Sequence, residues 1–234
     1  MSKTKNQVLE EALGFQYGGM LKSELEFLYD FCIDKKVLEL GSMVGMSSYV
    51  IAHVAKEIHC VDAWDDDFDH LEHDQRQVDT YKGDWLKQDA PPNMLESFKQ
   101  NCKEFLDSGK MKMTQGWTQD VAHLFSEESF DVLFIDADHS RIGVTRDIIK
   151  YYHTIKTDAP ILFHDYDCVT WPGVTQAIVD SLDRGFIKPM PGQWSLVPQH
   201  FGQRVEPAPS ELSPAAKANR STSPGRIAVF QKTR

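Results

Sequence analysis

Short apolar runs alternate with amphipathic stretches along most of the chain. The runs typical of buried strands occupy residues 37–40, 58–61, 111–115, 131–135 and 160–164. Apolar residues at helical spacing predict helices near residues 22–33, 46–56, 93–107, 118–125, 141–155 and 173–184. Strands that alternate with helices in this way predict right-handed βαβ units. The fold class that we expect is therefore α/β, with a doubly wound, mostly parallel sheet and helices on both faces.

Two segments interrupt the alternation. Residues 62–92 form an insert rich in Asp, His and Trp. We expect this insert to act as a lid above the ligand crevice, with Trp64, Tyr81 and Trp85 available to stack on a ring. Residues 198–226 are rich in Pro, Ser and Ala, which predicts a flexible loop before a last strand at 227–231. Residues 1–234 are then expected to form a single domain.

Composition and charge narrow the range of partners. The 234 residues carry a formal net charge of −10 without a cluster of Lys and Arg, which argues against nucleic acid or an anionic membrane as a partner. No apolar run approaches the roughly 20 residues needed to cross a bilayer, and no apolar segment of a secretory signal follows the N-terminus. Four scattered cysteines without a CxxC pair are typical of free thiols. We therefore expect a cytoplasmic protein.

The turn after the first strand has the composition of a ligand-binding turn. Residues 39–47 read Glu-Leu-Gly-Ser-Met-Val-Gly-Met-Ser, so Gly41 and Gly45 allow a ligand to approach the backbone. A dinucleotide-binding turn would need GxGxxG, because the pyrophosphate sits on the start of the helix. Here the spacing is GxxxG, and the preceding carboxylate of Glu39 suits a ligand with a cationic amino group. A glycine turn with a purely structural role is the alternative.

The next two strands end in residues that suit a nucleoside. Asp62 ends the second strand, 21 residues after Gly41, where a carboxylate can accept hydrogen bonds from both hydroxyls of a ribose. The third strand runs into Gly116, Trp117, Thr118 and Gln119, which offer a flat ring and polar groups for a purine. Packing of Trp117 in the core is the alternative.

Acidic residues follow the fourth and fifth strands. Asp136 and Asp138 precede His139 in one turn, and Asp165 and Asp167 lie in the other. Carboxylates at neighbouring strand ends repel one another unless a cation or a proton lies among them, and oxygen ligands of this kind suit Mg²⁺. His139 could serve as a general base near neutral pH. The alternative is that these groups cap the following helix.

Three motifs in this order resemble a known family. Glu-Leu-Gly-x-x-x-Gly-x-Ser, Gly-x-Thr-Gln-Asp and Phe-Ile-Asp-x-Asp-His-Ser resemble class I methyltransferases of the metal-dependent catechol O-methyltransferase-like branch. Closer still is the similarity to bacterial relatives that methylate sugars and other natural products, and cephalosporin hydroxylase-type proteins carry a similar Asp-x-Asp-His-Ser segment. The resemblance covers about residues 20–180. It implies a Rossmann-like, seven-stranded sheet and S-adenosylmethionine as the cofactor.

The resemblance also implies roles for individual residues. Those expected to bind S-adenosylmethionine are Glu39, Gly41, Ser42, Gly45, Ser47, Asp62, Gly116, Trp117, Thr118, Gln119 and Asp136. Asp136 and Asp165 match two metal ligands of the family, and His139 matches its general base. Catechol-type enzymes place Asn after the second ligand, where this chain has Tyr166. The third ligand could then be Asp138 or Asp167, or the site could hold no metal.

These expectations favour one function and leave alternatives to it. The first is Mg-assisted O-methylation of a small hydroxylated acceptor such as a sugar, with His139, Asp136 and Asp165 as the catalytic residues. The second is an accessory or hydroxylase-like protein of a biosynthetic pathway that keeps the fold but not the chemistry. A nicotinamide-dependent oxidoreductase is disfavoured by the missing GxGxxG. The sequence does not name the acceptor, and it allows a homo-oligomer.

Overall fold

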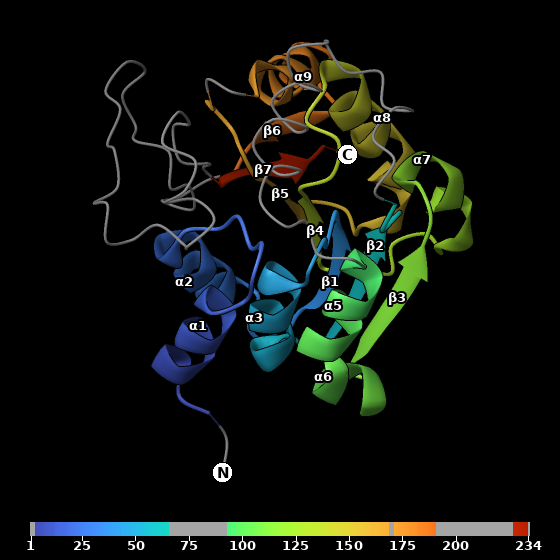
Figure 1. Cartoon of the computed structure of the whole chain (residues 1–234). Coiled ribbons are helices and arrows are strands. Elements are labelled where there is room, and N and C mark those ends of the chain that lie inside the picture. The colour runs from blue at the N-terminus through green and yellow to red at the C-terminus, as the bar shows by residue number, and fades with distance from the viewer. Residues whose placement is uncertain (1–2, 66–92, 169–170, 191–226, 234) are drawn as a thin grey trace.

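The computed structural model describes residues 3–65, 93–168, 171–190 and 227–233. Their strands form one seven-stranded sheet in the order β3-β2-β1-β4-β5-β7-β6 (Figure 1). The first five strands are parallel, while β7 runs antiparallel to both β5 and β6. The strands are β1 (Lys36–Leu40), β2 (Glu57–Asp62), β3 (Met111–Gln115), β4 (Val132–Ile135), β5 (Pro160–Phe163), β6 (Ile187–Pro189) and β7 (Ala228–Lys232). The predicted fold class is thereby confirmed.

Helices cover both faces of the sheet (Figure 1). The α-helices are α1 (Lys5–Leu13), α2 (Lys22–Phe31), α3 (Met46–Val54), α5 (Met94–Asn101), α6 (Lys103–Asp107), α7 (Thr118–Val121), α8 (Arg141–Tyr151) and α9 (Pro172–Asp183). Two short 3-10 helices, η2 (Ala122–Leu124) and η3 (Tyr152–Thr154), extend α7 and α8. Two buried clusters result: one packs beneath α1, α2, α3, α5 and α6, and the other beneath α8 and α9. Adjacent residues of one strand, such as Phe134 and Leu133, belong to different clusters because successive side chains point to opposite faces.

The structure departs from the sequence prediction in a few elements. The helix expected over residues 93–107 is two helices, because the backbone leaves the helical region at Cys102 (φ −103°, ψ 11°). Helix α1 and strand β6 were not predicted, and β7 lies one residue later than expected. All four cysteines are free and buried, as the scattered spacing indicated. Most of the predicted insert, residues 66–92, and the predicted loop at 198–226 lie outside the described residues.

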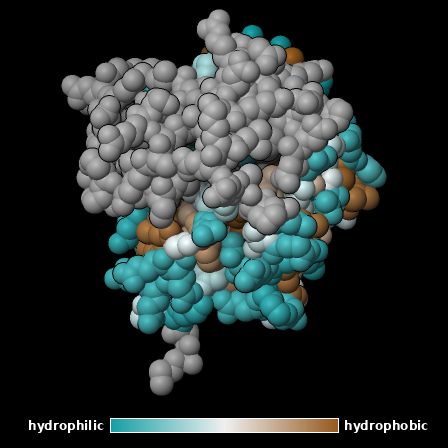
Figure 2. Space-filling model, in the orientation of Figure 1, coloured by the Kyte–Doolittle hydropathy of each residue, from teal (hydrophilic) through white to brown (hydrophobic). Residues whose placement is uncertain are grey.

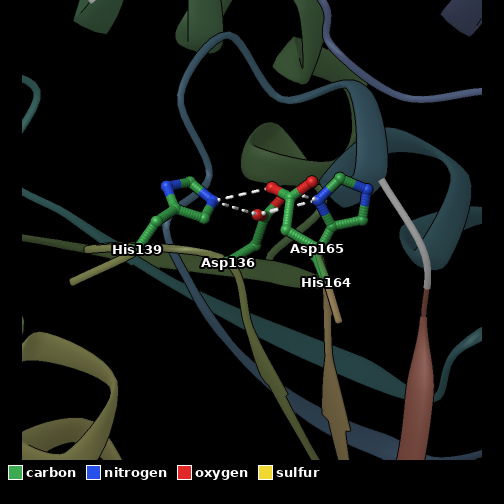
Figure 3. A group of neighbouring side chains, drawn as sticks. All are labelled: Asp136, His139, His164 and Asp165. Atoms are coloured by element: carbon green, nitrogen blue, oxygen red, sulfur yellow. Dashed lines mark hydrogen bonds and ion pairs between the residues drawn. The ribbon is translucent and has the colours of Figure 1, made fainter. Parts of the chain in front are cut away.

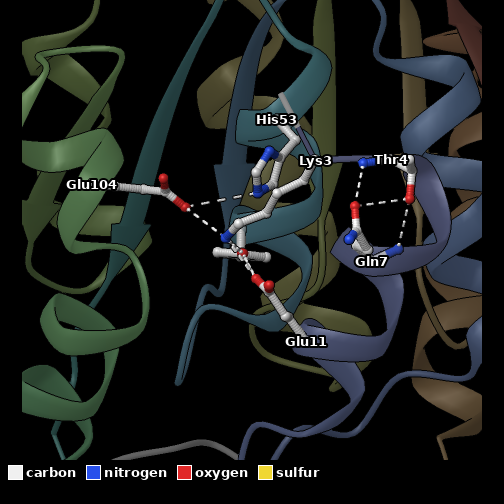
Figure 4. A network of polar contacts seen from close by, with 7 residues as sticks. Lys3, Thr4, Gln7, Glu11, His53 and Glu104 are labelled. Carbon is white, nitrogen blue, oxygen red and sulfur yellow. Dashed lines mark hydrogen bonds and ion pairs between the residues drawn. The ribbon is translucent and has the colours of Figure 1, made fainter. Parts of the chain in front are cut away.

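A polar network holds the beginning of the chain against α3 and α6 (Figure 4). The ammonium of Lys3 lies 2.6 Å from Glu11, donates to the hydroxyl of Tyr49 at 2.7 Å and lies 3.4 Å from Glu104. Tyr49 in turn donates to Glu11. Because these groups come from three helices and from the segment before α1, the network fixes α1 over the face of the sheet that α3 covers.

The described surface in Figure 2 is mostly hydrophilic. Six large apolar side chains remain exposed in the described residues: Ile33, Leu124, Ile142, Ile149, Val179 and Phe186. Among the helices that the structure describes, none is long and apolar enough to cross a membrane.

The order of the strands fixes where a ligand can bind. The chain moves outward from β1 to β2 and β3, and it then returns to place β4 on the other side of β1. The connections after β1 and β4 therefore diverge, which opens a crevice at the carboxyl ends of these two strands. Gly41 follows β1 and Asp136 follows β4, so both candidate motifs lie at this crevice.

Candidate active site

The glycine turn after β1 contacts the end of β4. Gly41 and Gly45 both have φ of +87°, in the left-handed region that favours glycine. A Cβ atom on Gly41 would lie 2.1 Å from the carbonyl oxygen of Asp136 and 2.6 Å from Cα of Ala137. On Gly45 it would lie 2.7 Å from the sulfur of Cys102. Gly41 therefore allows the turn to pack directly against the segment that carries Asp136, and Gly45 allows it to pack against Cys102.

The carboxylate of Glu39 is fully buried beneath the start of α3. It accepts hydrogen bonds from the hydroxyls of Ser42 (2.8 Å), Ser47 (2.6 Å) and Ser48. Burial raises the pKa of Glu39, whereas the serine hydroxyls oppose that rise because they stabilise the charged form. In this structure Glu39 thus joins strand β1 to the first turn of α3. Its predicted contact with a cofactor amino group stays a prediction.

Asp62, at the end of β2, organises the backbone of the glycine turn. One of its oxygens accepts from the backbone N–H of Met43 (2.8 Å), and the other accepts from that of Trp64 (2.7 Å). A carboxylate can accept about four hydrogen bonds, so Asp62 retains capacity for ligand hydroxyls. The indole N–H of Trp64 donates to the carbonyl of Met43 at 2.7 Å, and its ring packs on Phe98 with the centroids 4.7 Å apart.

Trp64 is consequently buried against the turn rather than presented to a substrate. The other two aromatic residues expected to stack on a ring, Tyr81 and Trp85, lie outside the described residues.

The segment after β3 lies beside Asp62. The N–H of Gly116 donates to the carbonyl of Asp62 at 2.8 Å, and Trp117 and Gln119 are partly exposed there. The hydroxyl of Thr118, in contrast, donates to the buried carboxylate of Asp147 on α8 at 2.5 Å. The structure therefore places Gly116 beside Asp62, leaves Trp117 and Gln119 partly exposed, and engages Thr118 with α8.

Two carboxylates and two imidazoles meet at the ends of β4 and β5 (Figure 3). Nε2 of His139 lies 3.3 Å from Oδ1 of Asp136 and 2.9 Å from Oδ2 of Asp165. Nδ1 of His164 lies 3.1 Å from each of the same two oxygens. One potential ligand atom from each residue lies within 4.8 Å of the other three. Figure 3 shows the carboxylates between the two rings.

Electrostatics favour charged groups in this cluster. Burial opposes the ionisation of Asp136 and Asp165, but the charge of His164 and hydrogen bonds from both histidines hold their pKa values below the usual range. Burial alone would lower the pKa of His164, yet the negative charges of Asp136, Asp165 and Glu24 raise it well above its usual value. The cluster is thus an ion-pair network in a nearly buried setting.

His139 is held from its other side by the start of α9. Its ring stacks on Trp171 with the centroids 4.9 Å apart and the planes at 25°. A Cβ atom on Gly173 would lie 2.6 Å from the carbonyl oxygen of His139, so this glycine lets α9 approach the loop closely. Pro172 begins the helix. Trp171 therefore packs on His139 and limits the positions that the imidazole can adopt.

Sequence reasoning missed two members of the site. His164 follows β5 directly, and Nε2 of its ring lies 3.2 Å from Oε2 of Glu24, a buried residue on α2. The one available signal for His164 was its position between an apolar strand and Asp165. No local signal marks Glu24, which lies in an ordinary amphipathic helix. Of the residues considered as a third metal ligand, neither Asp138 nor Asp167 belongs to the cluster in the described structure.

The donor set of the cluster does not fit Mg²⁺ well. Mg²⁺ binds oxygen ligands and keeps several of its waters. Here, however, a ring nitrogen of His164 lies 3.1 Å from each of the two carboxylates that the sequence assigned to Mg²⁺. Nitrogen and oxygen donors together are typical of first-row transition metals rather than of Mg²⁺.

Comparison with known protein families identifies the family of this chain. The profile of a family described as "Methyltransferase domain" matches residues 38–166, more than half of the chain. This chain belongs to the methyltransferase-domain family. The resemblance to class I methyltransferases that the motifs carried is thereby confirmed. No curated protein matches the sequence significantly.

Solved structures share the fold of this methyltransferase at low sequence identity. A proposed O-methyltransferase of Klebsiella pneumoniae has a TM-score of 0.61 and 13% identity, covering 98% of this chain and 90% of its own. The O-methyltransferase TomG of Streptomyces achromogenes, in complex with S-adenosylmethionine, has a TM-score of 0.59 and 12% identity. The match covers 100% of this chain and 92% of TomG. An S-adenosylmethionine-dependent O-methyltransferase of Thermotoga maritima has a TM-score of 0.56 and 11% identity. The match covers 97% of this chain and 71% of the Thermotoga protein.

Proposed function

We propose that this protein transfers the methyl group of S-adenosylmethionine to a hydroxyl group of a small polyhydroxylated molecule, such as a sugar or another natural product. One observation carries the proposal: the glycine turn packs against Asp136, and Asp136 contacts His139. A cofactor on the turn would therefore have its reactive end beside a histidine that is held by two carboxylates. Methyl transfer to oxygen needs this proximity of a methyl donor and a proton acceptor.

The residues of the crevice match the groups of S-adenosylmethionine. Asp62 can accept hydrogen bonds from ribose hydroxyls while it holds the backbone of Met43 and Trp64. Gly116 lies next to it and is followed by Trp117 and Gln119, which we expect to border an adenine beyond the ribose. Asp136 adds negative charge close to the turn, which favours a cofactor that carries a positive sulfonium and an ammonium group.

The chemical step has a simple balance. S-adenosylmethionine supplies an electrophilic methyl group; the sulfur–carbon bond breaks as the acceptor oxygen forms its bond to that carbon. The acceptor hydroxyl gives its proton to His139, and S-adenosylhomocysteine leaves. Asp136 and Asp165 orient the imidazole and stabilise the positive charge that it gains, because both lie within 3.3 Å of Nε2. The same carboxylates favour a neutral hydroxylated acceptor over an anionic one.

Calorimetric titration with S-adenosylhomocysteine, with NAD as the control ligand, tests the cofactor. Micromolar binding of S-adenosylhomocysteine alone is expected, and a screen of sugars and catechols with radiolabelled S-adenosylmethionine then identifies the acceptor. Binding of neither ligand would remove the proposed function. Cofactor binding without methyl transfer to any acceptor would favour the accessory or hydroxylase-like protein.

A further inference from the structure

The glycine turn between β1 and α3 is held from outside by side chains of two other segments. We propose that Trp64 and Asn101 are positioning residues of the cofactor site, which bind the carbonyls of Met43 and Val44 and fix the turn before the cofactor binds. The inference rests on the proposed function for the identity of the ligand, S-adenosylmethionine. Neither residue is among those that the family resemblance assigned to the cofactor.

The two peptide groups of Met43 are bound by the residues that follow β2. Its N–H donates to Oδ2 of Asp62 at 2.8 Å, and its carbonyl accepts the indole N–H of Trp64 at 2.7 Å. Oδ1 of Asp62 accepts from the backbone N–H of Trp64, also at 2.7 Å. The three residues form a closed ring of hydrogen bonds. The carboxylate expected to hold the ribose therefore also sets the position of the turn.

Met43 needs this support because its backbone lies in the left-handed region. Its φ is 46°, and that of Trp64 is 45°. For residues with a Cβ atom this region costs conformational free energy, and such a conformation persists where the surrounding contacts hold it. Loss of the indole N–H would remove the contact at the carbonyl of Met43 and allow the turn to relax.

Helix α5 holds the next residue of the turn. The side-chain amide of Asn101, the last residue of α5, donates to the carbonyl of Val44 at 2.8 Å. Phe98 lies one turn earlier on the same helix, and its ring packs on Trp64 with the centroids 4.7 Å apart. A Cβ atom on Gly45 would lie 3.0 Å from the ring of Phe98. Helix α5 and Trp64 therefore form one surface behind the turn.

These contacts lie at buried or partly buried positions, where a carbonyl without a partner is costly. Trp64 is 6% exposed, and Asn101 is partly buried. Removal of the donor leaves such a carbonyl unsatisfied, which costs more than the net contribution of the hydrogen bond itself. A turn that is fixed in advance binds its ligand more tightly, because less conformational freedom is lost on binding. The two side chains should therefore raise cofactor affinity through the turn.

Two substitutions in the full-length protein remove one donor each. Trp64→Phe keeps a ring against Phe98 and the backbone N–H that binds Asp62, and Asn101→Leu keeps the approximate size of the side chain. In calorimetric titrations, each variant should bind S-adenosylhomocysteine at least about fivefold more weakly, as one unsatisfied carbonyl implies. Methylthioadenosine has the adenine and the ribose but no amino acid. Its affinity should be unchanged, because both variants keep the contacts of Asp62.

Two control variants separate positioning from stability. Gln100→Leu makes a similar change at an exposed position of α5 and should keep the native affinity for both ligands. Phe105→Leu removes buried volume on α6, where the ring packs on Tyr49 and His53. This variant should lower the free energy of unfolding without a change in either affinity.

Hydrogen exchange tests the hold on the turn without any ligand. The backbone N–H groups of Gly41, Met43 and Gly45 are all hydrogen-bonded, so their exchange reports local opening of the turn. Exchange over residues 41–46 should be faster in Trp64→Phe and in Asn101→Leu than in the native protein and in Gln100→Leu.

Three results would each overturn the inference: unchanged exchange in both variants, unchanged affinity for S-adenosylhomocysteine in both, or an equal loss of affinity for the two ligands. A native protein that binds no S-adenosylhomocysteine would instead overturn the proposed function. The exchange rates would then still decide whether Trp64 and Asn101 hold the turn.

Discussion

A Cβ atom on Gly41 would lie 2.1 Å from the carbonyl oxygen of Asp136. The first residue after β1 and the first after β4 are therefore in direct backbone contact at the point where the strand order reverses. Neither segment can move away easily, because the N–H of Gly41 donates to Val61 and that of Asp136 donates to Leu40, both at 2.8 Å. The candidate cofactor turn and the candidate catalytic cluster thus form one rigid unit.

Replacement of Gly41 by alanine tests this unit. Gly41→Ala adds a Cβ that collides with backbone held in the sheet, and we expect the free energy of unfolding to fall by at least about 3 kcal/mol. Gly109→Ala is a matched control, because Gly109 also has positive φ (73°) but nothing lies within 4 Å of its added Cβ. Only the backbone strain of about 1 kcal/mol should then remain. Equal losses in chemical denaturation would show that the contact with Asp136 is not rigid.

Replacement of His139 by alanine tests proton transfer. His139→Ala should lower kcat at least about a hundredfold, because a positioned general base is lost. Affinity for S-adenosylhomocysteine should be unchanged, since the imidazole faces the carboxylates rather than the glycine turn. His123→Ala, at an exposed position on η2, is the control and should keep normal kcat. Normal turnover by His139→Ala would remove this residue from the mechanism.

Asp147 should make stability depend on pH. Burial raises the pKa of this carboxyl group to about 7, while the hydrogen bond from Thr118 acts in the opposite direction. Because the folded state binds its proton more tightly than the unfolded state, the stabilisation is complete below about pH 4 and is lost as the pH rises toward 7. The loss reaches at most about 4 kcal/mol, at about 1.4 kcal/mol for each pKa unit.

Asp147→Asn should abolish this slope, because the amide keeps an acceptor for Thr118 and does not ionise. Denaturant titrations between pH 4 and 8 measure the effect. Asp183→Asn makes the same change of charge at an exposed position and should keep the slope of the native protein. The prediction would be contradicted if the stability of the native protein and that of the Asp147→Asn variant changed by the same amount over this pH range.

Glu39 offers a test that separates a structural role from cofactor contact. Glu39→Ala leaves three serine hydroxyls without their acceptor and should lower the free energy of unfolding by about 3 kcal/mol. Glu39→Gln should cost less, because its amide can exchange hydrogen bonds with hydroxyls that rotate. The exposed Glu127→Ala is the control. If Glu39 contacts the cofactor directly, Glu39→Gln will also weaken S-adenosylhomocysteine binding, whereas a structural carboxylate leaves that affinity unchanged.

The architecture could be predicted from the sequence because buried strands and helices have characteristic local patterns of apolar residues. The all-apolar run of β4 and the alternation of such runs with amphipathic segments predicted a parallel sheet covered on both faces, which the structure confirms. Glycine at positions 41 and 45 likewise predicted a tight turn, since the left-handed backbone that both adopt excludes most other residues. The family motifs lie in these same local patterns, so the methyltransferase fold could also be predicted.

Elements with weak local patterns were missed. Strand β6 (Ile187–Pro189) spans three residues, one of them buried, so it has no apolar periodicity to detect. It forms only because it pairs with β7, which lies far along the chain. Helix α1 is polar along most of its length and packs through Val8, Leu9 and Ala12.

The partners within the candidate catalytic cluster were decided by tertiary structure alone. Asp136, His139 and Asp165 could be predicted because each follows a strand whose end the sequence marks. Glu24 could not, because it lies on a helix that precedes the whole sheet, and only the packing of α2 brings it to His164. The local sequence pattern indicates which side chains are buried. Which buried charges face one another depends on how distant elements pack, and that pairing sets the pKa values of the candidate site.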